Sequence, residues 1–254
     1  MFVSFVRNGI IILLGFSLFA CSNTASTDSG NDTNISSTTD GGNGTDLPFT
    51  SEEIVFNGLQ YMTIRSPRTG KVWLDRNLGA SRLCESATDE ICFGDFYQWG
   101  RSTDGHEKST STVSDVKLNT LVNTSAEFIG ATDWLEDGVD DDGSLRSFEW
   151  SKTDGSSVCP VGFRVPTITE LVDETTDNTI TNSATAYTSF WKIPTGKYRG
   201  YLGPITSWNE TTCLWSTSVP FQYHANPLCF DQDGVYTSSN TYHGMGHHIR
   251  CIKD

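Results

Sequence analysis

Residues 159–172 read CPVGFRVPTITELV, and this segment carries the clearest structural signals in the chain. Arg164 is expected to lie beside the core, where a carboxylate or carbonyl oxygen accepts its guanidinium group. Pro166 precedes Thr167-Ile-Thr-Glu170, which fits the S/T-x-x-E pattern of a helix capping box. The segment therefore predicts a short helix from about Ile168 to Thr175.

On both sides of this segment the local signals are mostly those of strands and turns. Residues 59–65 and 71–75 are rich in β-branched and aromatic side chains, and the turn-like sequence SPRTG lies between them, so we expect a hairpin. A weaker helical pattern covers Ser125–Leu135. Short strands are predicted at Leu214–Val219, Gly234–Thr237 and Ile249–Ile252.

The N-terminal segment predicts export and lipid attachment. Residues 1–20 combine one positive charge, Arg7, with an apolar run too short to span a membrane, which is typical of a signal peptide. The sequence LFAC at residues 18–21 resembles the lipobox of bacterial lipoproteins, so Cys21 is the expected acylated N-terminus and its partner is membrane lipid. Because Ser22 is not the Asp that retains lipoproteins in the inner membrane, the outer membrane is the predicted location.

The remaining chain divides into a tether and one domain. Residues 21–50 are dominated by Ser, Thr, Asn, Asp and Gly, which predicts a flexible, disordered tether behind the lipid. Residues 51–254 contain no solenoid repeat and no second linker, so they are expected to form a single domain. The chain has 254 residues and a formal charge of −14, and it lacks a basic run, which argues against nucleic acid as a partner.

Besides Cys21 the chain contains six cysteines, an even number that predicts disulfides in an oxidising compartment. Six cysteines allow 15 pairings, so any particular set is a hypothesis. We favour Cys84–Cys92, Cys213–Cys229 and Cys159–Cys251, the last of which closes the longest loop and should stabilise the fold most. A structural zinc site is disfavoured because the chain has no CxxC pair.

Five motifs occur in an order that resembles the Fibrobacter succinogenes major paralogous domain family. They are VWLDRNL (72–78), FYQWG (96–100), CPVGFRVPT (159–167), LWSTS (214–218) and IRCIKD (249–254). The resemblance covers about residues 54–254, with Phe163 in place of the family's Trp, Val165 in place of Leu, and an acidic insertion near residues 133–149. It implies a C-type-lectin-like fold related to formylglycine-generating enzymes: an α+β body with a twisted antiparallel sheet, few short helices and long loops.

The acidic insertion is the first candidate site. When it is laid on a calcium loop of 12 residues, Asp140, Asp142 and Glu149 fall at positions 3, 5 and 12, where oxygen ligands are expected. Gly138 occupies position 1, however, and that loses the first carboxylate. The segment therefore supports either a Ca²⁺ site or a solvated acidic loop, and we favour the loop.

Two other segments have metal-site alternatives that we do not favour. The stretch from Trp208 to Cys213 resembles the W-N-D-x-x-C of calcium-dependent lectins, but the partner proline motif is missing upstream. His243, His247 and His248 offer imidazole nitrogens, although His247 and His248 are neighbours and should point to opposite faces of a strand. Ordinary loop and strand histidines are the preferred interpretation.

Aromatic residues in the second half of the chain are the candidates for ligand stacking, because sugar rings and protein partners both pack on such faces. Trp73, Trp99 and Trp215 lie in the family motifs and are expected to be buried. The candidates outside the motifs are Trp134, Trp150, Trp208, Tyr236 and Tyr242.

No catalytic motif is present, and all six domain cysteines can be used in disulfides, so we predict no enzyme activity and no obligatory cofactor. The preferred hypothesis is a membrane-anchored surface lipoprotein whose domain binds a glycan or an envelope or extracellular protein. The alternatives are a structural envelope protein and, less favoured, an enzyme related to formylglycine-generating enzymes, which would need a free reactive cysteine pair.

Overall fold

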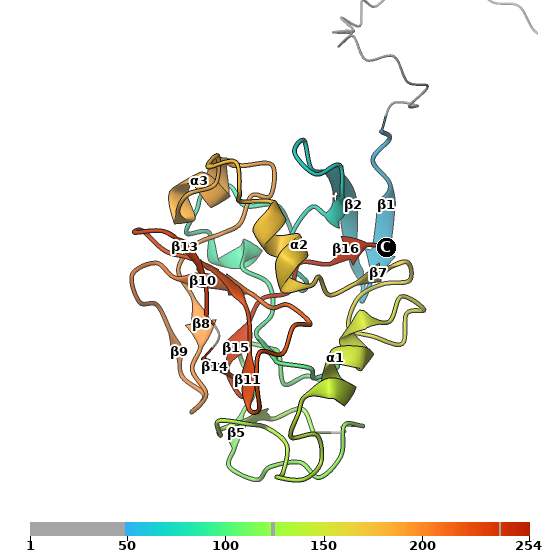
Figure 1. The fold of residues 1–254 in the computed structure, drawn as a ribbon, viewed down its shortest axis with the longest axis vertical. Coiled ribbons are helices and arrows are strands. Elements are labelled where there is room, and N and C mark those ends of the chain that lie inside the picture. Colours follow the sequence, from blue (N-terminus) through green and yellow to red (C-terminus); the bar gives the residue numbers. More distant parts are fainter. Residues whose placement is uncertain (1–48, 123–124, 239) are drawn as a thin grey trace, which may run out of the picture. The chain divides into compact units, whose positions relative to one another are not determined.

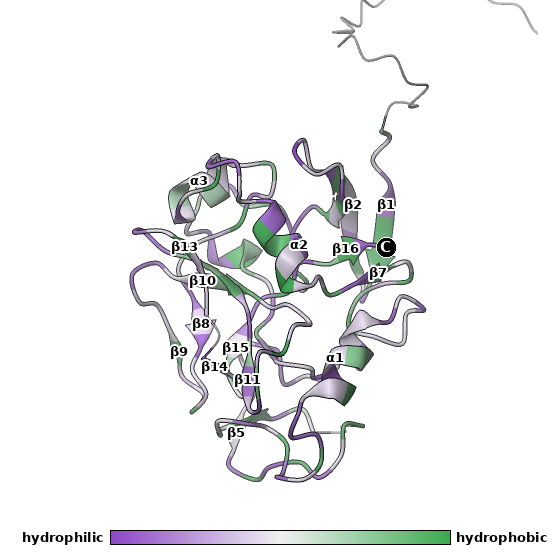
Figure 2. Cartoon of the chain, viewed as in Figure 1, coloured by the Kyte–Doolittle hydropathy of each residue, from purple (hydrophilic) through white to green (hydrophobic). Residues whose placement is uncertain are grey.

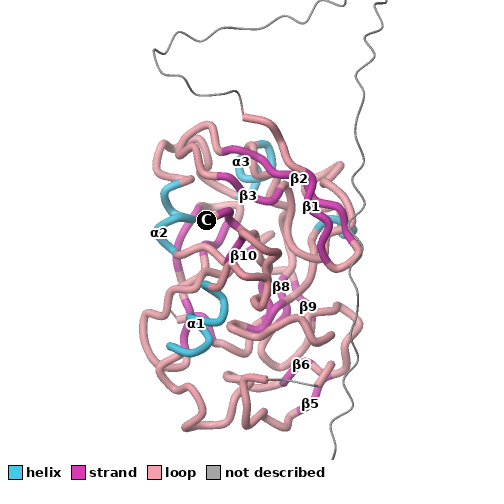
Figure 3. The backbone as a smooth tube through the Cα atoms, turned by 90° about the vertical axis from the view of Figure 1, so that its right-hand side faces the viewer, coloured by secondary structure: helices cyan, strands magenta, loops and turns pink. Residues whose placement is uncertain are grey.

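The computed structural model describes residues 49–122, 125–238 and 240–254. These residues belong to one compact unit, Leu47–Asp254. The predicted signal peptide, Cys21 and all but the last two residues of the predicted tether lie outside the described residues. The unit is mostly β, with few short helices and several antiparallel sheets, and long loops connect its elements (Figure 3).

The largest sheet has five strands in the order β1-β2-β3-β16-β7. Figure 1 labels β1, β2, β7 and β16 of this sheet. The strands are β1 (Glu53–Phe56), β2 (Leu59–Arg65), β3 (Val72–Leu74), β16 (Ile252–Lys253) and β7 (Phe163–Arg164). The pairing of β2 with β3 confirms the predicted hairpin, and the Tyr61 and Thr63 side chains of β2 are buried while their neighbours are more exposed, as strand geometry requires. The C-terminal strand β16 lies between two segments that precede it by many residues.

Four smaller sheets complete the unit, and most of their strands have only two residues. One contains β4 (Tyr97–Gln98), β15 (Gly246–His247), β8 (Tyr198–Arg199) and β9 (Ile205–Thr206). Another contains β10 (Thr212–Leu214), β12 (Leu228–Phe230) and β13 (Val235–Thr237). The two-stranded sheets pair β11 (His224–Ala225) with β14 (Thr241–Tyr242), antiparallel, and β5 (Val113–Ser114) with β6 (Phe128–Ile129), parallel.

The predicted strands are found in part. β13 lies within the predicted segment 234–237. Only Leu214 of the segment 214–219 is in a strand, since Trp215 and Thr217 donate their backbone N–H groups to the carbonyls of His248 and Pro166 in loop connections. Of the segment 249–252, only Ile252 is in β16.

The helices are α1 (Ser144–Ser151), α2 (Ile168–Asp173) and α3 (Ser183–Thr188), with one short 3-10 turn, η1 (Glu90–Cys92). The predicted helix is confirmed as α2, and its N-terminus is a complete capping box. The Thr167 side chain accepts from the Glu170 N–H, and the Glu170 carboxylate accepts from the Thr167 N–H. Figure 2 shows that α2 carries both hydrophobic and hydrophilic residues, and Leu171 is its buried residue. No helix of the described residues is both long enough and apolar enough to cross a membrane.

Arg164 finds the carboxylate partners that the sequence predicts. Its two terminal nitrogens contact both oxygens of Glu170 at 2.8 Å, and its Nε donates to Asp254 at 2.9 Å. The turn, the start of α2 and the C-terminus are thereby joined around one guanidinium group.

Replacing Glu170 by Gln is expected to destabilise the protein by about 1–2 kcal/mol at neutral pH, because an ionic hydrogen bond becomes a neutral one. Burial alone would raise the pKa of Glu170, but hydrogen bonds from Arg164 and Thr167 outweigh it and bring the pKa to about 2. This stabilisation is present above the ordinary pKa of glutamate and is lost as the pH falls toward 2. Melting curves of the wild type and the Glu170→Gln variant should therefore converge between pH 5 and pH 2. A difference that does not depend on pH would contradict this account.

Three groups of buried side chains form the core. The first contains Trp99, Trp150 and Trp215, the second contains Trp73 and Trp191, and the third contains Trp134. Trp73, Trp99 and Trp215 are fully buried, as their place in the motifs predicts. The three expected disulfides, Cys84–Cys92, Cys159–Cys251 and Cys213–Cys229, are all present.

The predicted helix at Ser125–Leu135 is wrong. Residues 128–129 form β6, parallel to β5, and Leu135 forms a bridge with Leu118. The buried Gln98 side chain takes both the N–H and the carbonyl of Ile129, at 3.0 and 2.8 Å. These tertiary hydrogen bonds use the groups that a helix would pair internally, so they override the local apolar spacing.

Candidate functional site

The acidic loop does not assemble the calcium ligands expected from the sequence. Asp140 points inward: its side chain is fully buried, and its Oδ2 accepts from Arg146 Nε at 2.8 Å. Its two oxygens also accept the backbone N–H groups of residues 145 and 146, at the start of α1. Both oxygens of the Asp140 carboxylate are therefore used by a buried guanidinium group and a helix N-terminus.

The other two expected calcium ligands also have other partners. Asp142 accepts from the N–H and the hydroxyl of Ser144, at 3.0 and 2.8 Å. Glu149 lies in α1 and contacts Lys152 at 2.7 Å. The structure therefore uses Asp140 and Asp142 to begin α1 and places Glu149 in a partly exposed ion pair, which corrects the calcium-loop hypothesis.

The three histidines near the C-terminus are all buried. His243 stacks on Trp99 and faces Asp133, with 3.1 Å between its Nδ1 and the carboxylate. Burial lowers the pKa of His247 to about 3 and that of His248 to about 4. These rings are neutral components of the core at physiological pH.

Two of the five stacking candidates are wrong because they belong to the core. Trp134 and Trp150 are fully buried, and their indole N–H groups donate to the carbonyls of Trp99 and Arg101. Trp208 is the most exposed of the five, with 68% of its surface accessible, and Tyr236 is 39% accessible. Tyr242 is half-buried.

Tyr242 is part of a row of four aromatic rings, Phe221, His224, Tyr242 and Tyr201, which we call the aromatic row. His224 and Tyr242 lie directly opposite each other on β11 and β14, with their ring centroids 5.1 Å apart. Phe221 contacts His224 at 5.3 Å, and Tyr201, from the loop between β8 and β9, contacts Tyr242 at 5.4 Å. Phe221 is exposed and the other three rings are half-buried, so three segments of the chain, at residues 201, 221–224 and 242, build one aromatic surface.

The acidic loop borders the aromatic row through Tyr223. Burial and the neighbouring carboxylates of Asp141 and Asp137 raise the pKa of the Tyr223 hydroxyl. The backbone of Tyr223 has a φ of 63°, which is unusual for a bulky residue, and its carbonyl accepts from the N–H of His243. Such strain persists only where the surroundings impose it, and it is frequent at functional sites.

The other end of the row borders exposed apolar residues. Leu202 follows Tyr201 and is 63% accessible, and Val113 of β5 is 48% accessible. Val113 packs against Gly203, so the two segments are neighbours. The surface therefore combines aromatic rings with carboxylates at one end and aliphatic groups at the other.

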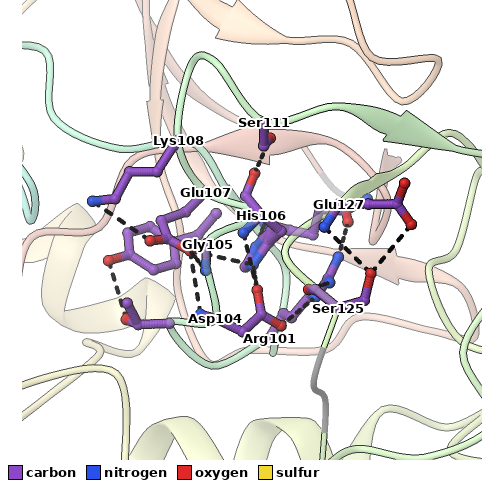
Figure 4. A network of polar contacts seen from close by, with 12 residues as sticks. Arg101, Asp104, Gly105, His106, Glu107, Lys108, Ser111, Ser125 and Glu127 are labelled. Carbon is purple, nitrogen blue, oxygen red and sulfur yellow. Dashed lines mark hydrogen bonds and ion pairs between the residues drawn. The ribbon is translucent and has the colours of Figure 1, made fainter.

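A second polar site, which the sequence did not predict, lies at residues 101–107 (Figure 4). Asp104, His106 and Glu107 bring one possible metal-ligand atom each within 4.8 Å of the others. His106 and Glu107 are fully buried. The sequence D-x-H-E at residues 104–107 could have indicated these possible metal ligands, but three such residues in a loop often occur without a metal.

The hydrogen bonds of His106 argue against a metal at this place. Its Nε2 accepts from the backbone N–H of Gln98 at 3.1 Å, so the ring proton must be on Nδ1. Nδ1 in turn contacts Asp104 Oδ1 at 2.6 Å, and burial lowers the pKa of His106, which keeps the ring neutral. Both ring nitrogens are therefore used, and the three residues form a hydrogen-bond network that holds the loop.

Comparison of the chain with protein-family models, with curated proteins and with solved structures gives no significant match. The resemblance to the Fibrobacter succinogenes major paralogous domain family therefore stays a prediction.

Proposed function

We propose that this chain is a non-catalytic binding protein whose domain holds a glycan on the aromatic row. The observation that carries the proposal is the continuous contact of Phe221, His224, Tyr242 and Tyr201, at centroid distances of 5.1 to 5.4 Å, on a partly exposed surface. Sugar rings offer apolar faces for such side chains and hydroxyl groups for their polar edges. The neighbouring carboxylates of Asp137 and Asp141 supply further hydrogen-bond acceptors.

The charge of the chain narrows the class of glycan. With a formal charge of −14 and acidic residues beside the row, the surface repels polyanions. A neutral or positively charged glycan fits this surface, whereas an acidic polysaccharide does not.

The sequence also predicts where the domain is located and which fold it has. The expected lipid on Cys21 and the tether would hold the domain at the outer membrane, and the resemblance to the Fibrobacter succinogenes major paralogous domain suggests a C-type-lectin-like fold. The strand-rich unit with its three disulfides is compatible with an extracytoplasmic location.

The enzyme alternative requires free cysteines. In the described residues all six cysteines are in disulfides, so a reactive thiol pair would first require reduction of one bond. Thiol titration of the unfolded, unreduced protein should accordingly detect no thiol in residues 51–254, and two thiols would favour the enzyme.

Replacing Tyr242 by Ala is expected to weaken glycan binding about tenfold, which corresponds to about 1.4 kcal/mol, because Tyr242 contacts both His224 and Tyr201 and is central in the row. The measurement begins with a glycan array probed with the full chain. Affinities of the wild type and the variant for the bound glycan then follow from isothermal titration.

The matched control is Phe148→Ala, because Phe148 is 61% accessible on α1 and lies outside the row. This control should bind like the wild type. The glycan would have to bind elsewhere if Tyr242→Ala and Phe148→Ala lost the same affinity. The same conclusion would follow if a Tyr242→Ala, Phe221→Ala double variant still bound the glycan. An array with no bound glycan would favour a protein partner or a structural envelope role.

A further inference from the structure

A separate cavity of about 260 Å³ lies where the β1–β2 turn meets the loop that carries the polar network of Figure 4. Its walls are apolar or aromatic and come from Phe56, Leu59, Tyr61, Leu78 and Tyr97. Its volume is just below the usual range for ligand sites, about 300–1,000 Å³, so it suits one small ring rather than a polymer. The cavity shares no residue with the aromatic row.

Polar groups converge on this cavity from several segments. Asp95 and Lys108 line it, and Lys108 Nζ contacts Asp95 Oδ2 at 2.7 Å. Asp95 Oδ1 accepts no hydrogen bond from the described residues, which leaves an acceptor at the cavity. The Lys108 side chain is 53% accessible, so the ion pair lies at the rim and has further donor capacity.

The positions of these groups are fixed by the backbone at Gly79. Gly79 has a φ of 80°, and a Cβ atom at this position would collide with the Asp95 carboxylate. The N–H of Gly79 donates to the Tyr61 hydroxyl at 3.0 Å, so the hydroxyl proton of Tyr61 is left to donate to another group. Gly79 therefore lies next to both an acceptor, Asp95, and a donor, Tyr61.

The charge on the Asp95 carboxylate lowers the stability of the folded chain. Burial raises its pKa, which means that the charged form is less stable in the folded chain than in water. Charged groups that reduce stability and line a cavity are typical of binding sites.

We propose that this cavity is a binding site for a single small polyhydroxylated ring, of the kind found at the end of a glycan. Asp95 accepts hydroxyl protons, Lys108 and Tyr61 donate to ring oxygens, and the apolar walls contact the C–H faces of the ring. Neutral hydroxyl groups match this mixture because they both donate and accept.

A small organic cation is the competing ligand, because Glu107 adds a second carboxylate to the lining. Glu107 is less suited to bind it, because Oε2 accepts the N–H groups of residues 104 and 105. Oε1 is buried and has no hydrogen-bond partner in the described residues, but it lies 3.5 Å from the positive charge of Lys108 Nζ. The lysine already supplies a positive charge where the cation would be placed. The observations therefore favour the polyhydroxylated ligand.

The test uses the full chain in detergent, with the Tyr242→Ala, Phe221→Ala double variant as the background, so that binding at the aromatic row is removed. The probes are methyl glycosides of glucose, galactose, mannose and N-acetylglucosamine, with cyclohexylmethanol as a ring with one hydroxyl and propylammonium as a cation. Saturation-transfer NMR detects contact and titration gives affinity. At least one glycoside should bind, and cyclohexylmethanol and propylammonium should not.

Asp95→Asn and Lys108→Met are each expected to weaken glycoside binding at least tenfold, and Glu53→Gln, which removes an exposed carboxylate from β1, should have no effect. Asp95→Asn removes a destabilising charge and should fold, and Lys108→Met alters a rim residue and provides the second measurement. The proposal would be overturned if all four glycosides failed to bind, if propylammonium alone bound, or if Asp95→Asn and Lys108→Met left the glycoside affinity unchanged. The aromatic-row proposal is unaffected by these outcomes, because its test uses different residues.

Discussion

Replacing Cys159 and Cys251 together by Ala is expected to lower the free energy of unfolding by about 4–5 kcal/mol. The bond joins residues 92 positions apart, and both cysteines are fully buried in the first core group with Trp99 and Trp215. Without the bond, the unfolded chain gains the entropy of a long open loop, and the core loses a covalent connection between the turn before α2 and the C-terminal strand. Chemical denaturation of the wild type and the double variant measures the difference.

The Cys84–Cys92 bond is the matched control, because its residues are only 8 positions apart and the loop-entropy relation gives about 2.5 kcal/mol for it. The loss of Cys159–Cys251 should therefore cost clearly more. If both double variants lose the same stability, loop entropy is not the dominant contribution, and local packing around the sulfurs would have to explain the effect.

The sequence predicted the elements that depend on local interactions. The β2–β3 hairpin follows from β-branched and aromatic residues on both sides of a turn, and α2 follows from Thr167, Glu170 and the preceding proline. The pairing of Cys159 with Cys251 was a hypothesis among many, and the structure agrees with it because β7 and β16 are neighbours in the large sheet.

The remaining elements depend on contacts between distant residues. A two-residue strand such as β15 has no period to detect, and its partners β4 and β8 lie far away in the sequence. The predicted helix at Ser125–Leu135 is wrong for the same reason. The side chain of Gln98, which is distant in sequence, hydrogen-bonds the N–H and the carbonyl of Ile129 and so holds this segment in an extended conformation. Tertiary hydrogen bonds override local patterns in these segments.

The same limit applies to the candidate site. The many aromatic residues in the second half of the chain predicted that a ligand stacks there. The sequence alone could not distinguish Trp134 and Trp150, which are buried in the core, from Tyr242, which is partly exposed. Phe221, His224 and Tyr201 acquire their role only when β11, β14 and the β8–β9 loop meet. The charge of the acidic loop is visible in the sequence, but the roles of its carboxylates are not. Asp140 accepts a hydrogen bond from Arg146, and Asp142 accepts one from the N–H of Ser144 at the start of α1.

Replacing Arg146 by Met is expected to destabilise the protein by about 3–5 kcal/mol at neutral pH, because the variant leaves two buried carboxylates without their cation. Arg146 is fully buried and contacts Asp133 at 2.6 Å and Asp140 at 2.8 Å. Its guanidinium also lies over the rings of Trp99 and Trp134, and these cation–π contacts are lost together with the charge, whereas methionine keeps the packing of the aliphatic stem. The loss measured by chemical denaturation should therefore report mainly on the charges.

The pH dependence distinguishes this electrostatic cost from a packing defect. Burial alone would raise the pKa of Asp133, but hydrogen bonds from His243 and Arg146 outweigh it and bring the pKa to about 2. The stabilisation is present above the ordinary pKa of aspartate and is lost as the pH falls toward 2, so the wild type and the Arg146→Met variant should approach each other in stability over that range. Lys152→Met removes the same charge from a partly exposed ion pair at the end of α1 and should cost less than about 1 kcal/mol at every pH. A constant difference between pH 5 and pH 2 for Arg146→Met would indicate that Arg146 acts through its shape and not through Asp133 and Asp140.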